Sequence, residues 1–132
     1  MYANHTFKKG ERIVSKKLIE ELFGGEKSRS MAVFPLRLVY MLGERSDGEE
    51  AAQLLISVPK RHFKRAVKRN RVKRQIREAY RMNKAMVMSR MAGRPATEKI
   101  AMAIIWTGNE LVSTEEVSEK TTKLLQRLAE KL

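Results

Sequence analysis

Residues 60–84 have the sequence KRHFKRAVKRNRVKRQIREAYRMNK and form the most strongly patterned segment of the chain. The segment contains twelve Lys or Arg residues and a single acid, Glu78, which gives it a formal charge of +11. The whole protein of 132 residues carries +13, so the other 107 residues contribute only +2. The positive charge is therefore concentrated in one segment and is not a general property of the chain.

The spacing in this segment predicts an amphipathic helix from about residue 68 to about residue 90. At about 100° per residue, apolar side chains fall on one stripe and polar or charged side chains on the opposite side. The apolar stripe comprises Val72, Ile76, Ala79, Tyr80, Met86 and Val87. The opposite side comprises Asn70, Lys73, Arg74, Arg77, Arg81 and Lys84. We expect the stripe to pack on a core while the charged side faces outward.

Two interpretations of the charged side remain, a solvated face and a surface that binds a polyanion. Solvated faces usually mix charges of both signs, whereas positions 69, 73, 77 and 81 are all cationic and no acid offsets them. Like charges four residues apart repel by roughly a few tenths of a kcal/mol, and a polyanion would remove that cost. A membrane surface is a poor candidate because the apolar side of the helix is needed for the core. The pattern favours nucleic acid.

Composition places the chain among small single-domain proteins. With 132 residues, 42% of them apolar, one domain with a real core is expected over residues 1–132. The chain has no cysteine, which excludes a disulfide framework and a thiolate metal site. The N-terminal segment lacks the apolar centre of a signal peptide, and no run reaches the length of a membrane span. We expect a cytoplasmic protein with no membrane association.

The N-terminal part predicts an arm followed by a short helix. Residues 1–14 are polar and basic, which predicts an extended arm that Phe7 and Ile13 pin to the body. Low order at the extreme end of this arm is an equal alternative. Ser15 is a suitable N-cap for a helix of about nine residues, which must be held by packing. The glycine pair at 24–25 ends this helix, because glycine favours a left-handed C-cap conformation.

Alternating apolar residues predict strands over residues 29–42 and 51–58. Pro35 breaks the first of these, so a short strand should precede it and a longer strand should follow. The loop of residues 43–50 is short, and we expect an antiparallel hairpin around it. Residues 100–106, IAMAIIW, are apolar throughout, which is typical of a strand covered on both faces.

A last helix is expected after Ser113, which matches a capping box with Glu116. Its apolar stripe comprises Val117, Thr121, Leu124, Leu125, Leu128 and Leu132. The complete order of elements is αβββαβα, with Pro35 separating the first strand from the second. This order predicts an α/β (α+β) two-layer sandwich, in which one sheet carries the helices.

The residue types needed for independent catalysis are missing. A protein nuclease requires positioned carboxylates with metal ions or an acid–base pair that includes histidine. The two histidines are His5, in the arm, and His62, near the start of the basic segment, where a surface RNA contact is favoured over a catalytic base. There is no glycine-rich phosphate loop, HExxH or DxD motif. The inventory predicts a binding protein.

The motif Arg69-Asn70-Arg71, within KRNRVKRQIREAYR, closely resembles the signature of the bacterial ribonuclease P protein component. The similarity continues in residues 7–13 (FKKGERI), in Leu22-Phe23-Gly24 and in residues 57–61 (SVPKR). The motif RNR alone is a weak signal, but the longer pattern after a strand, at this length and charge, is specific. The resemblance implies a four-stranded mixed sheet with a ribosomal-protein-S5-domain-2-like fold.

The resemblance also implies a function. The protein would be the accessory subunit of a ribonucleoprotein endoribonuclease and would assist removal of the 5′ leader from precursor tRNA. The implied partners are ribonuclease P RNA and precursor tRNA, and the protein alone would be a monomer. Cleavage would be carried out by the RNA and its Mg²⁺, with no metal expected on the protein. This division agrees with the missing catalytic residues.

Two sets of site residues follow from the resemblance. The RNA-binding set is Lys60, Arg61, Lys64, Arg65, Lys68, Arg69, Asn70, Arg71, Lys73, Arg74, Arg77 and Arg81. The set for a leader cleft between the first helix and the sheet is Phe7, Arg12, Ile19, Phe23, Phe34 and Tyr40. Asn70 either contacts RNA or orders a helix turn. Phe23 either stacks on RNA or belongs to the core.

Two other functional classes remain as alternatives. A ribosomal or general RNA-binding protein without catalytic association would use the same row of charges. It would bind mature tRNA as well as a precursor with its leader. A metal-dependent nuclease would cleave RNA without a partner, and the residue inventory argues against it.

Overall fold

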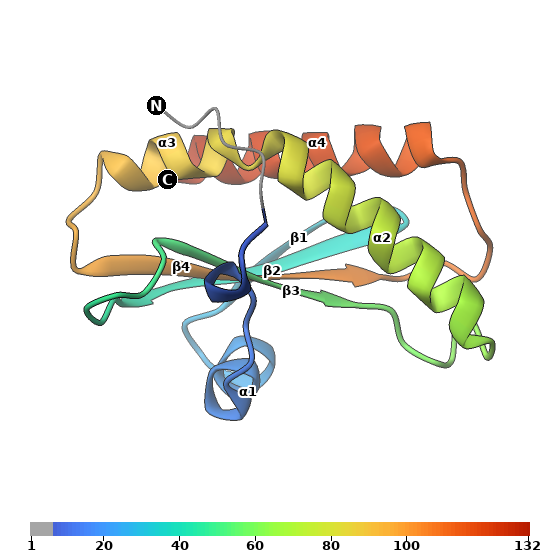
Figure 1. Ribbon diagram of the computed structural model, residues 1–132, viewed down its shortest axis with the longest axis horizontal. Helices are drawn as coiled ribbons and strands as arrows, with labels where there is room; N and C mark the ends of the chain where they lie inside the picture. The colour runs from blue at the N-terminus through green and yellow to red at the C-terminus, as the bar shows by residue number, and fades with distance from the viewer. Residues whose placement is uncertain (1–6) are drawn as a thin grey trace.

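The computed structural model describes residues 7–132. Its elements follow the predicted αβββαβα order, with a 3₁₀ turn before the first helix and one additional helix, α3 (Figure 1). The elements are η1 (Lys9–Glu11), α1 (Lys16–Gly24), β1 (Arg29–Val33), β2 (Leu36–Glu44), β3 (Ala52–Ser57), α2 (Ala66–Asn83), α3 (Ala85–Ala92), β4 (Glu98–Trp106) and α4 (Thr114–Lys131). Within the described residues, no helix combines the length and the apolar character that crossing a bilayer requires.

The four strands form one mixed sheet in the order β1-β2-β4-β3. β2 is antiparallel to β1 and to β4, whereas β3 runs parallel to β4. The predicted hairpin between β2 and β3 is therefore wrong, because β4 lies between these strands. Residues 100–104 of β4 are buried on both faces of the sheet. Such a strand belongs in the interior of a sheet, and β3 takes the edge.

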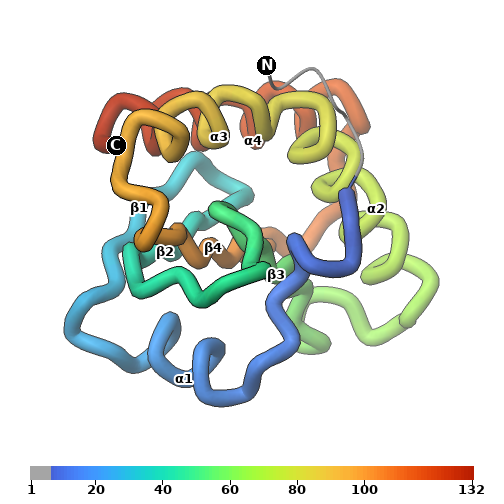
Figure 2. Tube along the Cα trace, turned by 60° about the vertical axis from the view of Figure 1, so that its left-hand side comes forward, coloured from blue at the N-terminus to red at the C-terminus, as the bar shows by residue number. Residues whose placement is uncertain are grey.

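Helices cover both faces of the sheet. Figures 1 and 2 show α2, α3 and α4 on one face and α1 on the other. Side chains of β2 alternate between the two faces. Leu36, Leu38 and Tyr40 join the larger core on the side of α2 to α4, whereas Val39 and Met41 join a smaller core with α1. The predicted sandwich of sheet and helices is confirmed, and α1 is a separate cover on the opposite face.

The helix α1 begins and ends close to its predicted limits. The hydroxyl of Ser15 accepts a hydrogen bond of 3.3 Å from the N–H of Leu18, which confirms the N-cap. At the other end, Gly25 has a φ of −82°, so the expected left-handed conformation is wrong. Glycine is needed there for another reason. A Cβ atom at Gly25 would overlap the carbonyl oxygen of Glu21, which accepts the Gly25 N–H.

The single helix predicted over residues 68–90 is instead two helices, α2 and α3, which meet at Lys84. Within α2 and α3 the predicted apolar stripe is buried, apart from Met86, which is half-buried. Lys84, at the break between the helices, was predicted on the charged side. It is instead buried, and its ammonium lies 2.7 Å from the carboxylate of Glu11. Because the helix is interrupted at this position, the periodicity that placed Lys84 outside does not apply.

The last helix, α4, packs against α2 and α3 and closes the larger core. The hydroxyl of Ser113 accepts a hydrogen bond of 3.1 Å from the N–H of Glu116, which confirms the predicted cap. Gln75 of α2 donates a hydrogen bond of 2.9 Å to the hydroxyl of Thr114. The predicted stripe is buried at Val117, Thr121, Leu124, Leu125 and Leu128, and half-buried at Leu132.

The described part of the predicted arm lies along the edge strand β3. Ile13 is buried, and its N–H donates a hydrogen bond of 3.1 Å to the carbonyl of Leu54. Phe7 packs edge-on against Tyr80 of α2, with 5.7 Å between the ring centroids. Both predicted pins of the arm are confirmed, whereas its residues 1–6 lie outside the described part of the chain.

The end of α1 yields a matched pair of substitutions. Gly25→Ala should destabilise the protein by about 1–3 kcal/mol, because the added methyl group meets a backbone oxygen that cannot move freely. Gly24→Ala adds a methyl group with no atom within 4 Å, and should be neutral or stabilising by up to about 1 kcal/mol. Urea denaturation of the two variants measures the difference. Equal midpoints would contradict the proposed steric role of Gly25.

Candidate nucleic-acid interface

The outward side of α2 is a continuous basic face, which we define by eight residues of the predicted RNA-binding set. Lys68, Asn70, Arg71 and Arg74 are exposed, and Arg69, Lys73, Arg77 and Arg81 are half-buried along its flank. The first turn of α2 contains no acid, and no side chain caps its amino terminus. Cations at this end oppose the helix dipole, so the charge pattern does not serve helix stability.

Arg81, at the far end of the basic face, is matched by an acid. Its Nη2 lies 2.8 Å from Oε2 of Glu78. The hydrogen bond between them lowers the pKa of Glu78 and raises the pKa of Arg81. The prediction that no acid offsets the cations at positions 69, 73, 77 and 81 is therefore wrong for Arg81. A phosphate would have to compete with Glu78 for this arginine.

Arg69 holds the loop that precedes α2. Its Nη1 donates hydrogen bonds of 2.8 Å to the carbonyl of Phe63 and 2.7 Å to the carbonyl of Lys64. Phe63 is buried and packs against Trp106, with 6.2 Å between the ring centroids. The first arginine of the motif thus has a structural role that its position in the sequence did not reveal.

The loop between β3 and α2 supplies the remaining predicted cations. They are Lys60, Arg61, Lys64 and Arg65, and all four are exposed. The neighbouring His62 is half-buried, and its Nδ1 lies 2.7 Å from Oδ1 of Asn109 in the loop after β4. This contact ties two loops together at the same end of the sheet, and it gives His62 a structural partner.

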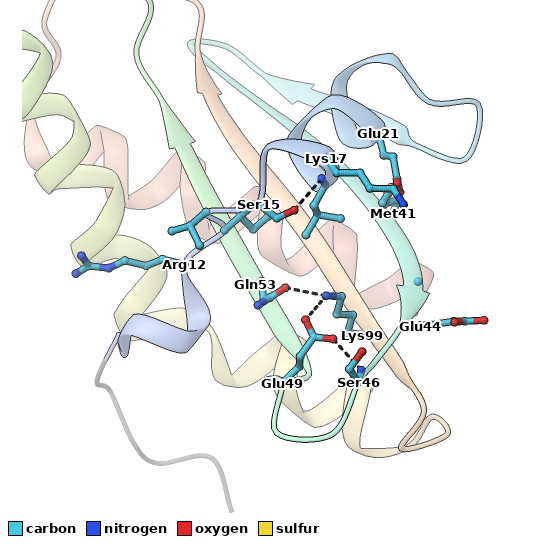
Figure 3. Close-up of a pocket in the computed structure, with 14 residues that line it drawn as sticks. Arg12, Ser15, Lys17, Glu21, Met41, Glu44, Ser46, Glu49, Gln53 and Lys99 are labelled. Atoms are coloured by element: carbon cyan, nitrogen blue, oxygen red, sulfur yellow. Dashed lines mark hydrogen bonds and ion pairs between the residues drawn. The ribbon is translucent and has the colours of Figure 1, made fainter.

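A groove of about 590 Å³, called here the α1 groove, lies between α1 and the sheet (Figure 3). Its charged lining residues are Arg12, Lys17, Glu21, Glu44, Glu49 and Lys99. Lys99 is paired with Glu49 at 2.6 Å, and this hydrogen bond lowers the pKa of Glu49. Figure 3 shows Arg12 extending away from that pair. The groove is therefore mixed in charge, and Arg12 and Lys17 are its exposed cations.

A smaller hollow of about 160 Å³ lies at the carboxyl end of α1. Phe23 lines it together with Arg29 and Arg37. Phe23 is 47% exposed, which makes its ring available for stacking and argues against a purely core role. The two arginines were not predicted as site residues. Arg37 stands between buried Leu36 and Leu38 of β2, and this interruption of an apolar strand is the signal that would have placed it on the other face.

The other predicted leader residues do not gather at the α1 groove. Tyr40 is buried in the core on the opposite face of the sheet, so its assignment to the cleft is wrong. Phe34 is exposed in the turn between β1 and β2, beside Gly108, and Phe7 packs on α2. Ile19 is half-buried against the smaller core, where it contributes packing.

Residues 7–132 contain no cluster of side chains of the kind that holds a metal ion. They include no group of three or more His, Cys, Asp or Glu side chains that could hold a metal ion. His62 is engaged with Asn109, and His5 lies outside the described residues. Among the described residues, the exposed cations on α2 and in the loop before it are the groups that a polyanion could contact.

Comparison with known proteins agrees with this arrangement. A family model described as Ribonuclease P matches residues 7–129. The ribonuclease P protein component of Porphyromonas gingivalis is 38% identical over 121 residues, which are 92% of this chain and 85% of the relative. The ribonuclease P protein component of Chlorobium phaeobacteroides is 28% identical over 129 residues, which are 94% of this chain and 88% of that relative.

Solved structures share the fold. The RNase P protein of *Thermotoga maritima* superposes with a TM-score of 0.64 at 23% identity, over 89% of this chain and 96% of that one. The RNase P protein of *Staphylococcus aureus* also gives 0.64, at 18% identity, over 89% and 94% of the two chains. Because the family model spans nearly the whole chain, this chain belongs to the ribonuclease P protein component family, the protein subunits of a ribonucleoprotein endoribonuclease.

Proposed function

We propose that this protein binds ribonuclease P RNA through the basic face of α2 and the basic loop before it. We further propose that it binds the 5′ leader of precursor tRNA along α1. In this role it assists endonucleolytic removal of the leader during tRNA 5′ maturation. The RNA and its Mg²⁺ carry out the cleavage, and the protein enters the complex as a cytoplasmic monomer.

The separation of the two sides of α2 carries the proposal. Val72, Ile76 and Tyr80 are completely buried, whereas Arg71 and Arg74 are exposed. Cations that neutralise phosphates release counterions and give affinity without base specificity. If about six phosphates are engaged, affinity should fall by roughly three orders of magnitude between 50 and 200 mM salt.

Support for leader binding comes from the residues at the two ends of α1. Arg12 lies before the helix, and Arg29 and Arg37 line the hollow at its carboxyl end. The exposed ring of Phe23 stands in the same hollow and could stack on a base, a contact worth about 1–3 kcal/mol. Because acids such as Glu21 line the α1 groove between these ends, we place the phosphate contacts at the ends.

Reconstitution with the cognate ribonuclease P RNA tests the proposed function. At low Mg²⁺, adding the protein should increase cleavage of precursor tRNA, because cations on the protein offset repulsion between the RNAs. Protein alone should cleave nothing. No gain in cleavage would reject the proposal.

Affinity for tRNA separates this function from general RNA binding. The reconstituted complex should bind a precursor with its leader more tightly than mature tRNA, because only the precursor reaches Phe23 and its neighbouring arginines. Equal affinities, measured by equilibrium binding, would favour an RNA-binding protein without a role in leader recognition. A Phe23→Ala variant should reduce the difference between the two tRNAs.

Substitutions within the motif should divide RNA contacts from structural contacts. Arg71→Ala with Arg74→Ala should lower the slope of log affinity against log salt by about 1.4–1.8, and should change the free energy of unfolding by less than about 0.5 kcal/mol. Arg69→Ala should instead destabilise the fold by about 1–2 kcal/mol, because two backbone carbonyls lose a charged donor. Salt titration and urea denaturation measure the two effects. A large destabilisation by the double variant would show that those side chains are structural.

A further inference from the structure

A buried ion pair joins two segments that are 73 residues apart in the chain. Oε1 of Glu11 lies 2.7 Å from Nζ of Lys84, and the side chains are 3% and 8% exposed. The other oxygen of Glu11 accepts a hydrogen bond of 2.7 Å from the N–H of Lys8. Burying two charges costs free energy that their attraction offsets only in part. Two apolar side chains of similar size in place of Glu11 and Lys84 could therefore make the fold equally stable. The pair is better explained by what it positions.

Arg12 directly follows Glu11 in the chain. On one side of Arg12, Glu11 is held by the ion pair. On the other side, the buried Ile13 is hydrogen-bonded to Leu54 of the edge strand β3. The guanidinium of Arg12 stands over the ring of Phe7, with 5.1 Å from Cζ to the ring centroid. Arg12 is exposed, but the backbone on both sides of it is fixed.

In this position Arg12 faces the basic face of α2. It lines a groove of about 210 Å³ together with Lys73 and Arg77. Cations that share one groove repel each other, and a phosphate placed among them would replace that repulsion with attraction. Arg12 also lines the α1 groove. One side chain therefore connects the two surfaces to which RNA binding is assigned.

We propose that the Glu11–Lys84 ion pair is a latch that positions Arg12 to bind an RNA phosphate together with Lys73 and Arg77. Glu11 is then a positioning residue for RNA binding, and the inference rests on the proposed function for its RNA partner. An acid close to an RNA surface ordinarily weakens binding, so removing it should strengthen binding. The latch predicts the opposite effect for Glu11. Removing Glu11 should weaken RNA binding, because Arg12 is then no longer held in position.

The test measures the affinity of the full chain for ribonuclease P RNA as KCl is varied. Arg12→Gln should lower the slope of log affinity against log salt by about 0.7–0.9, which corresponds to one phosphate contact. Glu11→Gln should lower this slope by the same amount. The variant that combines the two substitutions should show no larger decrease in slope than either single variant. Hydrogen exchange at the amide of Ile13 in the free protein should accelerate in Glu11→Gln and stay unchanged in Arg12→Gln.

A second variant separates positioning from stability. Glu11→Gln leaves the charge of Lys84 buried without its carboxylate, which could prevent folding. Glu11→Gln combined with Lys84→Met removes that charge and should raise the melting temperature toward the wild-type value. The latch is still absent, so the loss of slope should persist. The matched control is Glu119→Gln on α4, which neutralises an exposed acid and should leave the slope unchanged.

Two results would overturn the latch. One is a wild-type slope in the folded Glu11→Gln, Lys84→Met protein, which would reduce the pair to a stabilising contact. The other is a further loss of slope when Arg12→Gln is added to Glu11→Gln, which would show that the two residues act independently. Failure of the proposed function would look different, because the wild-type protein itself would then show no salt-dependent affinity for ribonuclease P RNA.

Discussion

Helix α2 packs its apolar side onto the larger core, and this contact fixes which side of the helix faces outward. Val72, Ile76 and Tyr80 are completely buried, and each large apolar side chain contributes about 1.5–3 kcal/mol when it is buried. Repulsion between cations one helical turn apart costs only a few tenths of a kcal/mol per pair, roughly. Packing therefore outweighs repulsion, and the helix folds with its cations gathered on the outward side. A polyanion bound to this side, as proposed, would relieve the remaining repulsion.

The order of the strands determines which segments of the chain lie next to α2. Because β4 occupies the interior of the sheet, β3 becomes an edge, and the arm lies along it. The arm brings Arg12 to a groove shared with Lys73 and Arg77, while α1 covers the other face of the sheet. The two proposed RNA surfaces therefore meet at the β3 edge, although their residues are far apart in the sequence.

Sequence patterns predicted features that are decided within one element, such as the caps at Ser15 and Ser113 and the stripe of α2. The predictions were wrong where the conformation depends on a residue or strand that is far away in the sequence. Lys84 could not be placed without Glu11, and strands adjacent in sequence were paired although β4 intervenes. Both faces of β2 are covered, so alternation alone could not tell which face Tyr40 occupies. The charge pattern and the motif indicated the basic face, but they did not show which of its arginines make structural hydrogen bonds.

Photo-crosslinking can show whether the outward side of α2 contacts RNA. The chain has no cysteine, so one introduced cysteine carrying a photoreactive group reports one position. Val67→Cys places the probe on α2 at a side chain that is 79% exposed and removes no charge, and Glu119→Cys places it on the exposed side of α4. Crosslinks to ribonuclease P RNA from position 67 and none from position 119 are predicted. Crosslinks from position 119 alone would place the RNA on α4 and show that the outward side of α2 is not the RNA-binding surface.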